Sequence, residues 1–410
     1  MERLLHYTWR HKLLPLATLR TTDGRIVEVV SPGQYNISNA GPDFFNAKVR
    51  LDGELWAGNV EMHTKASDWY RHHHDSDSAY DSVVLHVVEV ADMDTVTSQG
   101  RRVPTMELHI PEGLMADYRE LLTAEKYPPC HKVIPTLPRM KVHSWLNALQ
   151  TERLERKTIA MTGRVQAMGG SWEDGYFATL ARNFGFGING EAFEAWAQCM
   201  PMRAVDKHRD NLFQVESMFL GQAALLDRVD SRYSAEYKYL QRKFGMTPMD
   251  GTIWRYLRTR PQNFPHRRLM QLALMHHERR TSLGALLECR SAKDIGNLYG
   301  MKGKKLDLLI INTAIPTIFA YGQHHAKEYL CERAYRLLEE TGPEDNSIVR
   351  LWEDCGLKAE NAGDTQALIQ LRNEYCDTKN CLRCRFGFEF LTGEHRRAFF
   401  SENDEDYTQI

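Results

Sequence analysis

A chain of 410 residues is longer than one compact core can serve, because single cores stop growing at about 250–300 residues, so we expect more than one domain. Hydrophobic residues make up 42% and charged residues 26% of the chain, which excludes a disordered or fibrous protein. The formal net charge of −2 excludes a global positive field, so any binding of nucleic acid must come from a local basic patch.

The sequence predicts no targeting or membrane segment. The opening stretch MERLLHYTWRHKLLP carries charges and histidines within its apolar run, unlike a secretory signal peptide. No apolar run approaches the roughly 18 residues that a membrane span needs. Eight cysteines are too few for a disulfide framework in a chain of this length, so we expect a reducing, cytoplasmic location.

The first part of the chain, residues 1–112, predicts an α+β domain with a mixed sheet. Residues 1–15 carry apolar side chains at helical spacing. An Asp-Gly pair between two alternating segments predicts a β-hairpin, and the nearly continuous apolar run Ser82–Val90 predicts a strand that is buried on both faces. The expected strands cover residues 25–30, 44–51, 55–62, 82–90, 94–97 and 102–110.

Beyond about residue 112 the apolar residues follow a helical period, and Leu, Ala, Arg and Glu dominate. We expect a mostly α-helical domain over residues 113–340. A helical C-terminal extension that holds a cysteine cluster is expected over residues 341–410.

Glu61 and His63 lie two residues apart on the second predicted strand of the hairpin, so their side chains share one face, opposite Val60 and Met62. Asp43 precedes the first strand, and the hairpin can fold it back toward Glu61. Two carboxylates and a backbone carbonyl form a hard oxygen site that suits Mg²⁺ or Mn²⁺. Such an ion activates water and stabilises charge on a phosphate, and an adjacent imidazole can orient that water. The alternative is an exposed strand face with ordinary polar side chains.

These residues resemble the two acidic motifs of the PD-(D/E)XK nuclease superfamily. Gly41–Phe44 is similar to the first motif, and Glu61–His63 is similar to the second, with histidine where lysine is usual. The predicted order of helix, strand, hairpin and buried strand also fits. The resemblance implies a restriction-endonuclease-like fold for the N-terminal domain.

The same resemblance implies roles for individual residues. Asp43, Glu61 and the backbone carbonyl of Met62 would hold the metal ion. His63 would replace the lysine that positions the attacking water, and a neutral imidazole could act as a base or become a third ligand. A further acidic residue on the first helix would be Glu2.

The whole chain is identified as a member of a bacterial family known only as domain of unknown function 2851. The segments NAGPDFFNA, WAGNVEMH and DWYRHHHDSDSAYDSVVLHVV and the C-terminal cysteines carry this resemblance. It implies no activity.

Five histidines fall within the 24 residues from His63 to His86. His72 and His74 would point to one side if their segment is extended, and His86 on the buried strand could face Glu61. A catalytic or metal-binding role is one interpretation. The alternative is a solvated loop for the triplet and a hydrogen-bonded core histidine at position 86.

The C-terminal cysteines Cys376, Cys381 and Cys384 have the spacing of a metal knuckle, because thiolates two residues apart can reach one tetrahedral ion. A structural Zn²⁺ or an iron–sulfur cluster would need a fourth ligand. The candidates for that ligand are His395, Cys355 and Cys130. The alternatives are buried thiols and a redox pair.

Basic residues interleaved with aromatic ones in the helical part suit phosphate contacts and base stacking. A lysine-rich loop further along resembles the loop of a helix-hairpin-helix motif. The alternative for both is a solvated helix face. The candidates are Arg255, Arg258, Arg260, Arg267, Arg268, Lys302 and Lys304.

Taken together, these patterns favour a metal-dependent nuclease that hydrolyses phosphodiester bonds of nucleic acid. The first alternative is a non-catalytic nucleic-acid-binding or scaffold protein with a nuclease-like fold and a structural metal at its cysteines. The second is a hydrolase of another class that uses the histidines on a small phosphorylated substrate.

Overall fold

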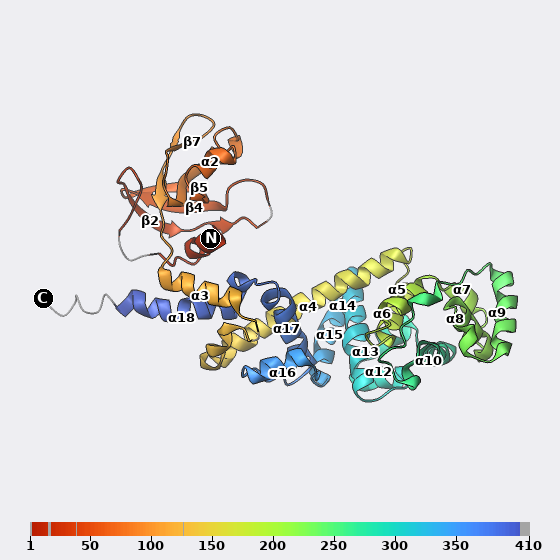
Figure 1. Ribbon diagram of the computed structural model, residues 1–410. Helices are drawn as coiled ribbons and strands as arrows, with labels where there is room; N and C mark the ends of the chain where they lie inside the picture. The colour runs from red at the N-terminus through yellow and green to blue at the C-terminus, as the bar shows by residue number, and fades with distance from the viewer. Residues whose placement is uncertain (1, 15–17, 38, 126, 402–410) are drawn as a thin grey trace. The chain divides into compact units, whose positions relative to one another are not determined.

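The computed structural model describes the chain from Glu2 to Ser401 except for residues 15–17, 38 and 126, with side chains described as far as Gly393 (Figure 1). Contacts divide the chain into two compact units. Unit 1 comprises Met1–Thr136 together with Glu374–Ile410, and unit 2 comprises Leu137–Asn373. The end of the chain therefore belongs with its beginning.

Unit 1 is built around a mixed sheet with the strand order β1-β2-β4-β5-β6-β9, in which β3 pairs with β4. From β1 to β5 the pairs are antiparallel, and β5, β6 and β9 run parallel. An antiparallel bridge between Thr21 and Met106 joins the two ends, so the sheet is nearly closed. The strands are β1 (Leu19–Arg20), β2 (Ile26–Ser31), β3 (Gln34–Tyr35), β4 (Phe44–Leu51), β5 (Glu54–Lys65), β6 (Val83–Val90) and β9 (Thr105–Glu107).

The central hairpin forms where the sequence predicts it. Asp52 and Gly53 have φ values of 51° and 86°, the left-handed conformation that a two-residue hairpin turn requires. In β4 the buried residues alternate with exposed ones, as expected for a strand with one face on a core. Strand β6 is buried at six successive positions, Val83–Val88, because it lies between two parallel neighbours. The expected mixed sheet is thus confirmed.

Smaller elements cover the sheet. Helix α1 (Glu2–Arg10) packs against β5 through buried residues such as Leu5 and Trp9, and the indole Nε1 of Trp9 donates to the Pro32 carbonyl. The segment predicted as the last pair of strands forms a separate two-stranded sheet instead. It consists of β7 (Thr95–Val96) and β8 (Arg102–Val103), and β9 follows.

The C-terminal segment adds helix α18 (Arg385–Ser401) and the short turn η9 (Cys381–Arg383) to unit 1. Helix α18 packs against α3 (Glu112–Thr123) and against the turn η2 (Pro129–Lys132). Lys379 Nζ also donates to the Ala124 carbonyl at 2.7 Å. These contacts join residues that are more than 250 positions apart in the sequence.

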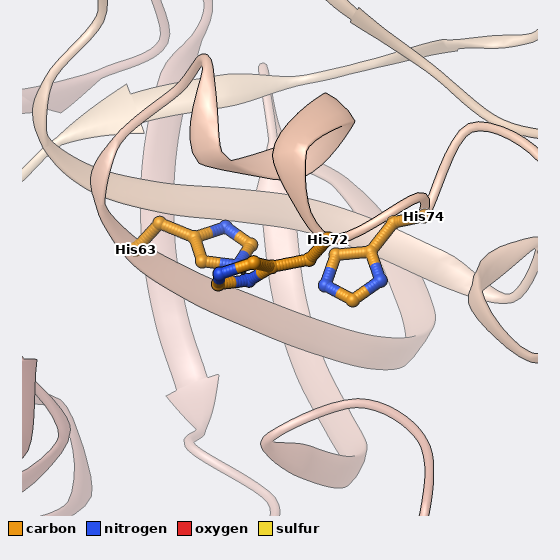
Figure 2. Close-up of side chains that lie close together, drawn as sticks. All are labelled: His63, His72 and His74. Carbon is orange, nitrogen blue, oxygen red and sulfur yellow. Dashed lines mark hydrogen bonds between the residues drawn. The ribbon is translucent and has the colours of Figure 1, made fainter.

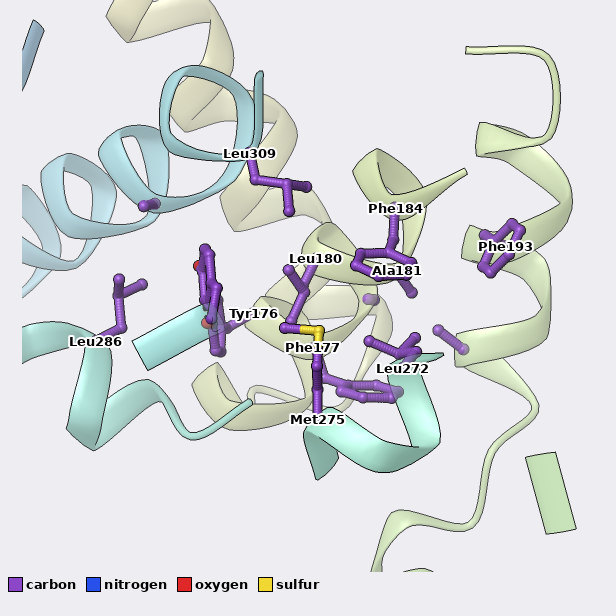
Figure 3. Close-up of a cluster of buried hydrophobic side chains, with 14 of the residues drawn as sticks. Tyr176, Phe177, Leu180, Ala181, Phe184, Phe193, Leu272, Met275, Leu286 and Leu309 are labelled. Carbon is purple, nitrogen blue, oxygen red and sulfur yellow. Dashed lines mark hydrogen bonds between the residues drawn. The ribbon is translucent and has the colours of Figure 1, made fainter. Parts of the chain in front are cut away.

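Unit 2 is helical, as the sequence predicts. Its core centres on α5, where Tyr176, Phe177 and Leu180 are buried among apolar side chains of neighbouring helices (Figure 3). The hydroxyls of Tyr176 and Tyr299 lie 3.0 Å apart and satisfy each other inside this core. The helices are α4 (Arg139–Ala167), α5 (Trp172–Phe184), α6 (Gly190–Gln198), α7 (Met202–Asp206), α8 (Leu212–Gln222), α9 (Ser231–Phe244), α10 (Pro265–His277), α11 (Leu283–Glu288), α12 (Ala292–Tyr299), α13 (Lys304–Leu309), α14 (Ile315–His324), α15 (Glu328–Glu340), α16 (Ser347–Asp354) and α17 (Ala362–Leu371).

Within the described ranges, none of these helices combines the length and the apolarity that crossing a bilayer requires.

Gly58 lets β5 and β6 approach closely. A Cβ atom at this position would overlap the side chain of Val84 and lie 2.7 Å from the Ser82 carbonyl oxygen. We therefore expect Gly58→Ala to lower the free energy of unfolding by about 1–3 kcal/mol, measured by denaturant titration. Gly163→Ala is the matched control, because nothing lies within 4 Å of that helical position, and it should be neutral or stabilising. Equal destabilisation by both substitutions would contradict this account.

The side chain of Lys157 is half-buried in unit 2, and its Nζ is enclosed, 2.6 Å from Gln366 Oε1 and 3.0 Å from Asn312 Oδ1. Burial, and then the charge of Arg153, lower the pKa of Lys157 to about 7. The unfolded chain, with an ordinary lysine pKa of about 10.4, therefore binds more protons between pH 7 and pH 10. The free energy of unfolding should rise with pH through this window. Thermal unfolding of wild type and Lys157→Met between pH 7 and 9.5 should show this rise only in wild type, and parallel profiles would contradict it.

Candidate metal centre

Histidines from two strands and one loop converge on one face of the sheet of unit 1. Glu61 and His63 come from β5, His86 comes from the adjacent position on β6, and His72 and His74 follow helix α2 (Asp68–Arg71). Figure 2 shows the rings of His63, His72 and His74 gathered together. One ligand nitrogen from each of these three rings lies within 4.8 Å of the other two. The sequence analysis named each of these histidines as a candidate, and their catalytic or metal-binding role stays a prediction.

The distances match those of a tetrahedral metal site. His63 Nε2 lies 3.1 Å from His72 Nδ1. Glu61 Oε1 lies 3.3 Å from His74 Nε2 and 3.5 Å from His63 Nε2. Because ligand bonds of ~2.1 Å at tetrahedral angles separate ligand atoms by ~3.4 Å, these three separations are those expected between ligands of one ion. The donors that all lie within 4.8 Å of one another are those of the three histidines, and Glu61 lies beside them, close to His63 and His74.

Burial makes this set of donors unusual. The exposed fractions of Glu61, His63 and His74 are 6%, 2% and 6%, whereas His72 is exposed. His74 Nε2 is within ion-pair distance of Glu61 but is not aligned for a hydrogen bond, and within the described chain neither ring nitrogen of His74 has a hydrogen-bond partner. Buried polar atoms are normally satisfied, so a metal ligand role fits this imidazole.

A left-handed residue places His72 and His74 on the same side. His73 has a φ of 62° and is exposed, so the chain turns there instead of running extended as the sequence-based argument assumed. Trp69 anchors the segment, since its Nε1 donates to the Val96 carbonyl at 2.8 Å. The ring of His74 then stacks on Tyr80 at 3.6 Å between centroids.

A second layer of contacts orients the His63 ring. His63 Nδ1 lies 2.9 Å from His86 Nε2, and His86 Nδ1 lies 3.5 Å from the hydroxyl of Thr95. The second nitrogen of a ligand histidine is usually engaged in this way, which fixes the ring orientation. His86 thus belongs to the site as a supporting residue and not as one of the converging donors.

The two predicted carboxylates accept hydrogen bonds from backbone N–H groups at each other's position in the hairpin. The Asp43 N–H donates to Glu61 Oε2 at 3.0 Å, and the Met62 N–H donates to Asp43 Oδ2 at 2.9 Å. One oxygen of each carboxylate is therefore occupied. Glu61 directs its other oxygen toward the histidines, and the role of the Met62 carbonyl as a ligand stays a prediction.

Helix α1 contributes His6 to the site. His6 Nε2 lies 3.3 Å from Asp43 Oδ2, and His6 Nδ1 lies 3.4 Å from the Tyr35 hydroxyl. Glu2, the acidic residue expected from this helix, is exposed. The sequence signal that could have found His6 is its position one helical turn after Glu2, on the same helix face.

The ionisable groups of the site have pKa values that differ from their ordinary ones. Burial, and then the charge of Asp43, raise the pKa of Glu61 to about 9. Burial and the neighbouring imidazoles lower the pKa of His63 to about 2 and that of His86 to about 3. Burial lowers the pKa of His6, but the hydrogen bond and charge of Asp43 outweigh it, so that pKa is raised. Neutral imidazoles are the form that binds metal, and a bound cation would favour the ionised Glu61 carboxylate.

The predicted ligands Cys376, Cys381 and Cys384 and the candidate Cys130 lie in unit 1, whereas the candidate Cys355 lies in unit 2. Cys376 ends the turn η8 (Arg372–Cys376), and the N–H of Cys384 donates to the Cys381 carbonyl at 3.1 Å. In the part of the chain that the structure describes, these cysteines are not among the sets of three or more donors that converge within 4.8 Å. His395 lies outside the residues with described side chains. Zinc or an iron–sulfur cluster at these cysteines stays a prediction.

The predicted nucleic-acid contacts divide among separate places in unit 2. Arg258, Arg260 and Arg268 line one hollow of about 340 Å³ together with Lys305. Arg268 is buried there, with its guanidinium 4.6 Å from the centroid of the Phe186 ring. The remaining candidates lie outside the lining of this hollow and are all exposed: Arg255, Arg267, Lys302 and Lys304.

Comparison with known proteins gives one match. No curated protein and no solved structure matches the chain. The model of the family described as protein of unknown function (DUF2851) matches residues 2–305 and 299–347, which include residues of both units and every donor of the histidine cluster. The chain belongs to this family.

Proposed function

We propose that unit 1 is a metal-dependent hydrolase that cleaves phosphodiester bonds of nucleic acid, with His63, His72, His74 and Glu61 as metal ligands. The observation that carries the proposal is the convergence of three imidazoles within 4.8 Å of one another, with the buried Glu61 carboxylate 3.3–3.5 Å from two of them. Three nitrogen donors suit Mn²⁺ or Zn²⁺ better than Mg²⁺, which prefers oxygen ligands.

The supporting residues give the site its chemistry. A bound ion would polarise a phosphate oxygen and lower the pKa of a water molecule. The exposure of His72 leaves one side of the centre open to substrate. Asp43 is 23% exposed at its side chain and holds His6, whose raised pKa suits a group that delivers a proton to a leaving oxygen.

The strand arrangement supports the nuclease interpretation at the level of the fold. A helix precedes five strands with antiparallel pairing, β1 to β5, and the next strand, β6, runs parallel to β5, which carries Glu61. This is the element order on which the resemblance to restriction-endonuclease-like proteins rests. The difference lies in the ligands, because Asp43 and one oxygen of Glu61 are already engaged with backbone N–H groups.

Calorimetric titration with Mn²⁺ and with Zn²⁺ tests the metal centre. We expect one ion per chain, and we expect His72→Ala and His74→Ala to weaken its binding by more than about tenfold, since each removes a ligand. His73→Asn is the matched control, because His73 is an exposed neighbour and asparagine tolerates its left-handed backbone. Equal effects of all three substitutions, or none, would contradict the assignment.

Hydrolysis tests the activity. Wild type loaded with Mn²⁺ or Zn²⁺ should cleave single-stranded or duplex oligonucleotides, and Glu61→Gln should lower the rate at least about 100-fold, because the neutral amide cannot balance the ion's charge. Circular dichroism of both proteins checks that the fold is kept. Metal binding by wild type without cleavage of any such substrate would instead favour a non-catalytic nucleic-acid-binding protein.

A further inference from the structure

A basic hollow of about 270 Å³ lies within unit 1, beside the candidate metal centre. Its walls come from α1, from the region of β3, from α3 and from the segment that precedes α18. Arg3, Arg10, Lys379 and Arg383 contribute four cationic side chains to the lining, which contains no aspartate or glutamate. The name basic hollow is used below for this site.

The cationic side chains of the basic hollow are not engaged in ion pairs with carboxylates of the described chain. Within the described chain, none of the four cations forms an ion pair with a carboxylate, although exposed arginines elsewhere in unit 1, such as Arg50 and Arg102, do. Arg10 lies over the ring of Tyr35, 5.7 Å from its centroid, and Lys379 donates to a backbone carbonyl. Four cations converging without acidic partners create a local field that attracts an anion.

The basic hollow and the metal centre share one residue. His6 lines the hollow, and its Nε2 lies 3.3 Å from Asp43 Oδ2. The Asp43 N–H in turn donates to Glu61, the carboxylate of the proposed centre. A ligand in the hollow would therefore lie next to the residues that are proposed to act on a phosphodiester.

Size and lining indicate what kind of phosphate fits. A volume of about 270 Å³ is at the lower end of small-molecule pockets and is too small for a duplex. Tyr35 and Tyr118 are half-buried in its wall and offer ring faces on which a base can stack. Arginine side chains suit the terminal oxygens of a phosphate group.

We propose that the basic hollow binds the phosphate group of a single nucleotide unit, either at the end of a strand or in a free nucleotide. The inference rests on the proposed function for its substrate class and gives that function a place for the substrate's phosphate. It also assigns a role to the C-terminal segment, because Lys379 and Arg383 flank the turn at Cys381 and complete the wall.

Binding measurements on the full chain, in chelator and at low salt, test this proposal without turnover. The probe is a short single-stranded oligonucleotide, fluorescently labelled at one end and carrying either a phosphate or a hydroxyl at the other. We expect the phosphorylated probe to bind at least tenfold more tightly. Arg3→Ala/Arg383→Ala, at two exposed positions, should remove this preference. The control Arg50→Ala/Arg102→Ala, which removes the same charge elsewhere in unit 1, should keep it.

Competition with an unlabelled nucleoside monophosphate distinguishes the two sources. Displacement at similar concentrations identifies the free nucleotide as sufficient, and weak displacement identifies the strand end. Absence of a phosphate preference in wild type, or its survival in Arg3→Ala/Arg383→Ala, would overturn the proposal. The affinity of the same variant for Mn²⁺, measured by calorimetry, should equal that of wild type. If metal binding and cleavage fail while the phosphate preference holds, the basic hollow stands and the hydrolase does not.

Discussion

A pair of hydrogen bonds between the start of β4 and the neighbouring part of β5 is the constraint on which the site depends. Glu61 accepts from the N–H of Asp43, and Asp43 accepts from the N–H of Met62, so both carboxylates are held in place. Burying a carboxylate is costly unless hydrogen bonds replace its lost hydration. The N–H of Asp43 supplies one such bond to Glu61 and restricts its rotamer. Held in place, Glu61 presents one oxygen to the histidines, and Asp43 presents one oxygen to helix α1. The hairpin, the helix and the histidine loop are thereby joined at one point.

The pKa shifts of the cluster agree with its geometry. A carboxyl group and several imidazoles share a volume from which water is excluded, and their pKa values move away from the charged forms. Proteins rarely collect so many ionisable groups in a core for stability alone, since apolar side chains would pack there at less cost. A bound cation would favour the ionised form of the carboxylate, because ionised carboxylates and neutral imidazoles are its natural ligands. The burial and the identity of these side chains thus support the proposed metal centre.

Local patterns predicted much of this arrangement, and non-local contacts account for the rest. The Asp-Gly turn fixed the hairpin, and with it the approach of Asp43 to Glu61, because both depend on neighbours in the sequence. His6 was missed because its partner, Asp43, comes close to it only in the folded chain. His72 and His74 lie on the same side because of a left-handed turn at His73, which sequence spacing does not reveal. The return of residues 374–410 to unit 1 depends on packing between α18 and α3, so no composition signal marks it.

That return affects how the protein is made. The segment carrying α1 leaves the ribosome before unit 2, whereas Lys379 and Arg383 leave it after the whole of unit 2. Domains generally fold as units during synthesis. The helical unit can therefore fold before unit 1 has all of its elements, since α18 and its contacts with α3 come after unit 2 in the chain. The basic wall is complete only after residues 379–383 have been synthesised, so a chain that stops within unit 2 would carry the histidines yet lack two of the four cations beside them.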